Sequence, residues 1–304
     1  DIYDRMPENA KDAFFEQMYF HVMEYRNIAE EYVYYWKNLE YAKQGRYNSA
    51  KAYAELSQKA VQEIWNNTKN FWTINNGKWD QSINPNHDYS LAQGMVLLGE
   101  NRYQYAEEQD GIGAFAEGAS AVGSGTLKFN SLSDDTRYFD VFSRNSGAEG
   151  WTAEAPEWVK LSMTEGETST EQRVLVTIDW SKVTDTQTGH IVVKDSAGKT
   201  AADFTVNAVN KGDFDYGNTK GYVEANGYVM VEAEHYSDKA NGTSGDSWNV
   251  IKSNGQRGDT MCASDKAPEL GKDPANIKKN GAKLIYNVYF EKAGTYNGVF
   301  YRVP

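Results

Sequence analysis

The first ninety residues carry apolar side chains at helical spacing. One stripe recurs at steps of three and four: Phe14, Met18, Val22, Tyr25, Ile28, Tyr32, Trp36 and Leu39. The pattern predicts one helix over residues 8–43, about 54 Å long at 1.5 Å per residue. Gly45 is the predicted helix stop, and a second helix follows it. Because so long a stripe is buried only against helices of similar length, residues 1–93 are expected to form a helical bundle.

The pattern changes to period two after residue 125. Val174, Val176, Ile178 and Trp180 lie on one face of a predicted strand. Short strands separated by turns predict an antiparallel, immunoglobulin-like sandwich over residues 126–209. Residues 94–125 are read as a connecting segment and 210–221 as a linker. Strands resume over 222–304, which is expected to be part of a jelly-roll-like sandwich. The fold class is therefore multidomain, α followed by all-β.

The stretch VMVEAEHY, residues 229–236, combines strand alternation with two carboxylates. On a strand, Glu232 and Glu234 would share one face, about 6–7 Å apart. That separation suits a glycosidase acid pair, but parallel side chains on one face do not flank a bond from opposite sides. Three interpretations stay open for the pair: a solvated or hydrogen-bonded face, a Ca²⁺ site, or catalysis.

Composition excludes several classes of protein. The net charge of −12 argues against binding to nucleic acid or to anionic membranes. No apolar run approaches the roughly 20 residues that span a membrane. The lone Cys262 excludes an intrachain disulfide and a thiolate zinc site. No catalytic motif is found and no catalytic residue is assigned. The 21 Tyr and 8 Trp are typical of a large interface, of platforms for carbohydrate, or simply of domain rims.

Residues 227–261 resemble the C-terminal domain of glycoside hydrolase family 115, which removes 4-O-methyl-glucuronic acid from xylan. The marks are VMVEAEHY, the following Trp248, and the turn from Gly255 to Met261. Three helical motifs resemble the bundle that follows that family's catalytic barrel: KDAFFEQMYFHV, YAKQGR and GKWDQSINPNHDYS. In the last of these, Gln81 stands where the family tends to carry a His.

The resemblance implies that the catalytic barrel lies before residue 1 and that the last sandwich continues beyond residue 304. The chain is then a fragment, expected to be periplasmic, cell-surface or secreted, whose parent acts on xylan. The missing barrel or a second copy would be its partner, and Tyr34, Trp79 and His87 are expected at such an interface. No cofactor is required, although a structural Ca²⁺ at Glu232 and Glu234 is compatible with the pattern.

Residues 150–208 resemble the BACON modules of glycan-degrading proteins from Bacteroidetes. The resemblance rests on Trp151, on Pro156 with Trp158, and on Asp179 with Trp180. Trp151 and Trp158 are candidate carbohydrate-binding residues, although packing inside the sandwich is the more common role for Trp in strands. The rival interpretation of the whole chain is a free-standing carbohydrate-binding or surface scaffold protein.

Overall fold

The structure is a computed structural model that describes residues 2–85, 97–133, 135–212, 214, 219–255, 258–264 and 270–302. The chain divides into two compact units. The first joins Asp1–Leu127, Thr136–Ile178 and Thr188–Val206, and the second joins Lys128–Asp135, Asp179–Gln187 and Asn207–Pro304. Among the described helices, none combines the length and the apolar character needed to cross a bilayer.

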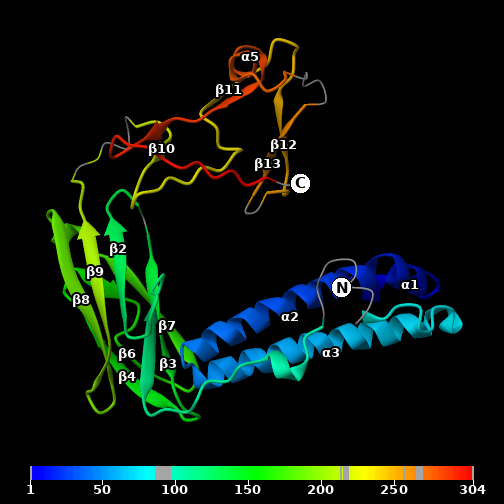
Figure 1. The fold of residues 1–304 in the computed structure, drawn as a ribbon, viewed down its shortest axis with the longest axis horizontal. Helices are drawn as coiled ribbons and strands as arrows, with labels where there is room; N and C mark the ends of the chain where they lie inside the picture. The colour runs from blue at the N-terminus through cyan, green and yellow to red at the C-terminus, as the bar shows by residue number, and fades with distance from the viewer. Residues whose placement is uncertain are drawn as a thin grey trace. The chain divides into compact units, whose positions relative to one another are not determined.

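The N-terminal part is a hairpin of two long helices (Figure 1). A short 3-10 turn, Tyr3–Arg5, precedes α1 (Glu8–Phe14), a π-helical stretch (Phe15–Tyr19) and α2 (Phe20–Lys43). These run on without a break, as the stripe predicts for residues 8–43. The hairpin returns through α3 (Tyr47–Gly77), and a 3-10 turn follows at Glu100–Arg102.

The ends of the helices follow local chemistry. Gly45 adopts a φ of 73°, the left-handed conformation that ends a helix, which confirms the predicted stop. The end of α3 is irregular, because Ile74, Asn75 and Asn76 leave helical geometry before Gly77. The backbone N–H of Asn75 donates to Asp12 Oδ2 at 2.9 Å, which ties this turn to α1.

The middle part is a sandwich of two sheets. One has the order β1-β3-β7-β5 and the other β2-β9-β8-β4-β6. The strands are β1 (Ile112–Ala116), β2 (Ser124–Asn130), β3 (Arg137–Ser143), β4 (Glu149–Glu154), β5 (Val159–Leu161), β6 (Glu165–Thr168), β7 (Glu171–Ile178), β8 (Thr186–Asp195) and β9 (Thr200–Val209), with a 3-10 turn at Trp180–Lys182. The sandwich thus begins at residue 112, earlier than the predicted boundary at 126.

The core of the sandwich lies between the sheets. Val174 and Val176 of β7 are fully buried, as their alternation predicts, and the rings of Phe139 and Phe204 join the two sheets at 5.4 Å between centroids. Strand β3 differs from the others because residues 139–143 are all buried. Its outer face is covered by the turn between α2 and α3, through contacts described below.

The C-terminal part holds three separate strand pairs. Strands β10 (Tyr222–Val223) and β15 (Val288–Tyr289) are parallel; β11 (Asp238–Ala240) with β14 (Lys283–Ile285), and β12 (Trp248–Ile251) with β13 (Thr260–Ala263), are antiparallel. A short helix, α5 (Pro274–Asn280), begins at Asp273, whose carboxylate accepts the N–H of Ala275 at 3.0 Å. Helices followed by mostly antiparallel sheets confirm the predicted fold class.

Candidate functional site

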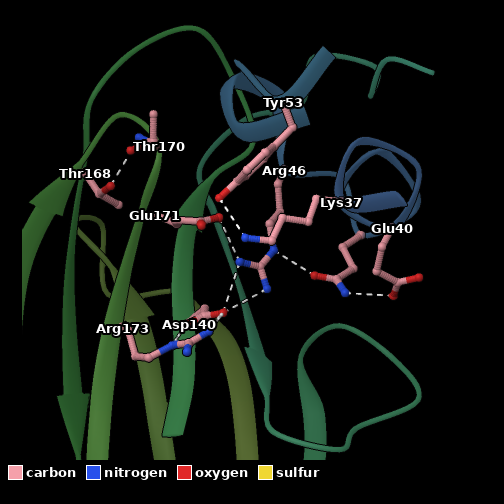
Figure 2. Close-up of polar contacts among 10 residues, drawn as sticks. Lys37, Glu40, Arg46, Tyr53, Asp140, Thr168, Thr170, Glu171 and Arg173 are labelled. Carbon is pink, nitrogen blue, oxygen red and sulfur yellow. Dashed lines mark hydrogen bonds and ion pairs between the residues drawn. The ribbon is translucent and has the colours of Figure 1, made fainter. Parts of the chain in front are cut away.

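A buried polar cluster of the first unit lies where the α2–α3 turn meets the sandwich (Figure 2). Arg46, only 2% exposed, donates from Nη1 to Asp140 Oδ2 at 3.1 Å and to Glu171 Oε2 at 2.9 Å. Its Nε donates to Gln44 Oε1 at 2.7 Å. The guanidinium carbon lies 4.3 Å from the Tyr41 ring centroid and 4.7 Å from that of Phe142. A buried cation is therefore matched on every side by acceptors and ring faces.

Asp140 connects this cluster to a second arginine. Arg173 donates from Nε to Asp140 Oδ1 at 2.8 Å, and the pairing raises the pKa of Arg173. Burial and the nearby carboxylate of Glu171 raise the pKa of Tyr41 to about 12. Every charge here is neutralised within the cluster, and the side chains fill the space between them. The cluster is a structural junction between hairpin and sandwich, since it leaves no group available for chemistry.

The buried face of α2 is rich in polar side chains, although Phe20 and Ile28 are also buried in this helix. Glu24, Asn27, Glu31 and Asn38 are buried there, although such residues are seldom buried in a helix pair. Part of the reason is the extended segment around residues 98–104, whose backbone needs hydrogen-bond partners. Asn38 accepts the N–H of Gln104 at 3.0 Å and donates to its carbonyl at 2.7 Å, while Glu31 Oε1 accepts the N–H of Leu98 at 2.6 Å. Peptide backbone thus pairs with Glu31 and Asn38, beside apolar contacts such as that between Phe20 and Phe71 of α3.

Glu31 is a buried carboxylate with a perturbed pKa. Its side chain is fully buried, and burial raises its pKa to about 7 against the opposing hydrogen bond from Leu98. Within the part of the chain that the structure describes, Oε2 has no hydrogen-bond partner. The neighbouring Ser57 hydroxyl donates to the Glu31 carbonyl at 2.8 Å and accepts from Tyr103 at 3.0 Å.

The opposite face of the same helix is apolar and exposed. Five large side chains are more than half exposed: Met18 56%, Val22 61%, Tyr25 54%, Val33 52% and Trp36 62%. We call them, together with the exposed Ala29 between them, the α2 seam. At 100° per residue they lie within about 80° of arc. Much of the stripe predicted to be the core therefore faces solvent, a correction to the sequence interpretation.

Tyr34 lies away from this seam, at the edge of the face that α2 buries. It is half-buried, with its ring 6.0 Å from that of Tyr53 on α3. The expected interface residue therefore takes part in the contact between the two helices.

A hollow of about 310 Å³ lies at the end of the hairpin where α1 begins. It is lined by Glu16, Gln17, His21, Phe71, Trp79, Ser82 and Ile83. The indole of Trp79 is held in place, because Nε1 donates to Glu16 Oε2 at 3.1 Å and the ring lies 6.3 Å from Phe71. Ring faces with a carboxylate, an amide, an imidazole and a hydroxyl suit a small neutral, hydroxylated molecule. His87, predicted with Trp79 as an interface residue, lies outside the described residues.

The two candidate sugar-stacking tryptophans of the sandwich differ in exposure. Trp151 is 2% exposed, and its Nε1 donates to Gln172 Oε1 at 2.8 Å, so it offers no ring face to a ligand in this structure. Trp158 is half-buried and packs over Gly189, where an added Cβ would lie 2.9 Å from the indole. Both residues thus contribute to packing, and only Trp158 keeps an accessible edge.

Residues 229–236 do not form the predicted strand. The N–H of His235 donates to the carbonyl of Glu232 at 3.0 Å, which closes a turn within the segment. Glu234 Oε1 accepts the N–H of Asp259 at 3.1 Å, and the carbonyl of Glu232 accepts the Tyr222 hydroxyl at 3.4 Å. The alternation therefore did not place the two carboxylates on one strand face. In the described ranges, no group of three or more His, Cys, Asp or Glu is arranged to hold a metal ion.

Sequence reasoning missed the Arg46 junction. Arg46 and Asp140 are 94 residues apart in the chain, so no local spacing connects them. One signal was present: β3 carries apolar residues on both faces around a lone Asp, which is typical of a strand covered on both sides.

Comparison with known proteins concerns mainly the C-terminal part. Residues 221–304 match the family model described as the glycosyl hydrolase family 115 C-terminal domain. No curated protein matches the chain.

Solved structures are similar over parts of the chain only. A Bacteroides ovatus GH5 xyloglucanase in complex with a XXXG heptasaccharide shares 18% identity, covering 30% of this chain and 18% of that one, with a TM-score of 0.23. An S-layer protein shares 16% identity over 54% of this chain and 22% of its own, with a TM-score of 0.27. A Bacteroides vulgatus protein shares 17% identity over 36% of this chain and 100% of its own, with a TM-score of 0.21. Since these scores are low, they carry no functional argument. The family match concerns one part of the chain: residues 221–304 are similar to the glycosyl hydrolase family 115 C-terminal domain.

Proposed function

We propose that this chain is the non-catalytic C-terminal region of a secreted xylan α-1,2-glucuronidase. The observation that carries the proposal is the match of residues 221–304 to the family 115 C-terminal domain. The barrel that performs the hydrolysis is then a separate part of the parent protein, and this region supplies packing surface, oligomer contacts and weak contact with xylan. The family 115 motifs in the helical part support the same assignment.

The structure offers features suited to each of these roles. The α2 seam is an apolar surface of the kind that monomeric proteins seldom leave in water. The hollow beside Trp79 has the ring faces and polar atoms that suit a sugar unit. A structural Ca²⁺ at Glu232 and Glu234 would need further oxygen ligands, since the calcium ion takes six to eight.

The test is the chemistry itself. The purified chain, incubated with glucuronoxylan, is expected to release no 4-O-methyl-glucuronic acid, because on this proposal the hydrolytic barrel is a separate part of the parent protein. The same chain joined to a family 115 barrel is expected to support release. Release by the chain alone, abolished by a point substitution within it, would overturn the proposal.

A free-standing carbohydrate-binding protein is the second candidate, and the Trp79 hollow favours it. Affinity electrophoresis through glucuronoxylan separates the candidates when wild type is compared with W79F and H21A. W79F keeps a ring face in the hollow, while H21A removes an exposed polar group that the described packing does not need. Strong retention that both substitutions weaken favours the binding protein, whereas weak or absent retention favours the glucuronidase region.

A further inference from the structure

A second hollow of the first unit, of about 520 Å³, lies beside the turn that ends α2. Its lining comes from the end of α2 around Lys43 and Gly45, from the extended segment 105–109, and from Arg144, which directly follows β3. The charged side chains of the lining are Lys43, Arg144 and Glu107, so the hollow is net positive in a chain whose net charge is −12. A cationic hollow on an acidic protein favours a small anion over the rest of the surface.

Arg144 differs from the neighbouring arginines of the junction. Arg46 and Arg173 both pair with the carboxylate of Asp140. Within the described residues Arg144 forms no ion pair, and its Nη2 donates to the neutral amide oxygen of Gln109. Its Nε is shielded from solvent and has no acceptor among the same residues. The guanidinium is therefore hydrogen-bonded in part, but its charge is not neutralised.

The incompletely filled edge of Arg144 is one that suits a carboxylate. Nε–H and one Nη2–H point in the same direction, and arginine binds a carboxylate through two such parallel bonds. Gln109 Oε1 occupies half of this edge, and the backbone N–H of Gln109 donates to the Arg144 carbonyl at 2.9 Å, which keeps the two residues side by side. Because the Gln109 side chain is exposed, it can give way to a ligand. A carboxylate would supply both the missing acceptor and the missing charge.

Capping of α2 does not account for Arg144. The N–H of Gly45 donates to the carbonyl of Ala42, and the N–H of Arg46 donates to that of Tyr41, both at 3.0 Å. These helix-end carbonyls therefore already have partners. Gly45 acts differently, because without a Cβ it lets the guanidinium lie against the turn: Nε is 3.7 Å from the place where a Cβ would stand. The turn thus positions Arg144 at the wall of the hollow without using its charge.

The rest of the lining suits a hydroxylated ring. Tyr105, 58% exposed, offers a ring face, and Val122 offers an aliphatic wall, while Lys43 can donate to hydroxyls and Glu107 can accept from them. We propose that this hollow binds a hexuronate, a sugar ring that carries a carboxylate, with the carboxylate on the Nε–Nη2 edge of Arg144. The inference goes beyond the proposed weak contact with xylan and does not rest on it, because its test measures the binding of a free sugar acid.

Titration of the complete chain with D-galacturonate at low ionic strength, followed by ligand-observed NMR, tests the inference. D-galacturonate is expected to bind more tightly than D-galactose, which lacks the charge, and than acetate, which lacks the ring. R144Q is expected to raise the dissociation constant at least about tenfold, because the paired cation is lost. R26Q is the matched control, since it removes the same charge from a side chain that is 63% exposed elsewhere on α2. No binding, no preference for the sugar acid, or equal losses in R144Q and R26Q overturns the proposal.

Two substitutions of Gln109 test the assigned edge without removing the arginine. Q109E places a carboxylate on that edge within the chain, so it is expected to raise the unfolding temperature and to abolish binding of D-galacturonate. Q109A leaves the edge open and is expected to keep the binding. Unchanged affinity in Q109E would show that the ligand does not use Arg144, and loss of binding in a folded Q109A would show that the amide holds the ligand; either result contradicts the proposal.

Discussion

The helical hairpin and the sandwich differ in how their elements divide polar and apolar side chains between the inner and the outer face. In the sandwich, β7 turns Val174 and Val176 inward and leaves Arg173 and Leu175 more exposed. In the hairpin, α2 turns Glu24, Glu31 and Asn38 inward and leaves Val22 and Trp36 in solvent. The periodicity of apolar residues therefore shows which residues share a face of an element. It does not show whether that face is buried within the same domain. In α2 several large apolar side chains are exposed on the face away from α3.

The largest loss of stability is expected from a substitution at the junction between the hairpin and the sandwich. R46A should destabilise the first unit by about 3–5 kcal/mol, because it leaves the buried Asp140 without its cation. The unfolding transitions followed by the helical and the sheet signals in circular dichroism should both move to a lower denaturant concentration. R26A is the control: that side chain is 63% exposed, and its loss should cost less than about 1 kcal/mol. Equal effects of R46A and R26A would mean that the junction does not hold the two regions together.

The buried Glu31 of the hairpin is expected to make the stability of the chain depend on pH. Glu31 has a pKa of about 7 in the folded chain against 4.5 without burial, so the folded state binds the extra proton between these values. Its contribution to stability therefore falls as pH rises from about 4.5 to 7 and stays low above that.

E31Q removes this dependence and keeps an acceptor for the Leu98 N–H. The gain in unfolding free energy of E31Q over wild type should be near zero at pH 4.5 and about 3 kcal/mol at pH 8. Denaturant unfolding followed by the helical signal at both pH values measures it. A gain that is the same at both pH values, or larger at pH 4.5, would contradict a buried carboxylate with a raised pKa.

The smallest change in stability is expected from a substitution on the exposed face of α2. V22T should change the stability of the monomeric chain by less than about 0.5 kcal/mol, because Val22 is 61% exposed. V174T, the same substitution in the sandwich core, should cost more than about 1 kcal/mol, because it buries a hydroxyl. Thermal unfolding in dilute solution compares the two, and a V22T loss as large as that of V174T would show that the seam is covered within a single chain.

Local rules predicted much of the fold but little of the candidate site. Gly45 ended the first helix as expected, because its left-handed backbone is a local property. The alternation of Val174 and Val176 gave the inner face of β7, because a sandwich strand has only one core to face. The prediction of which side of α2 is buried was wrong for much of the stripe. The segment around Leu98 and Gln104 contributes backbone groups to the buried side, and backbone groups leave no hydrophobic pattern in the sequence. VMVEAEHY was also wrong as a strand, since local alternation cannot supply the neighbouring strand that a ladder requires.

The orientation of α2 is the central claim, and hydroxyl-radical footprinting with mass spectrometry measures it most directly. In dilute solution, where any dimer is dissociated, Met18, Tyr25 and Trp36 should be modified fast, and Phe20, which is 1% exposed, should be protected. Fast modification of Phe20 together with protection of Met18 and Trp36 in dilute solution would show that the helix faces the other way and would contradict the account.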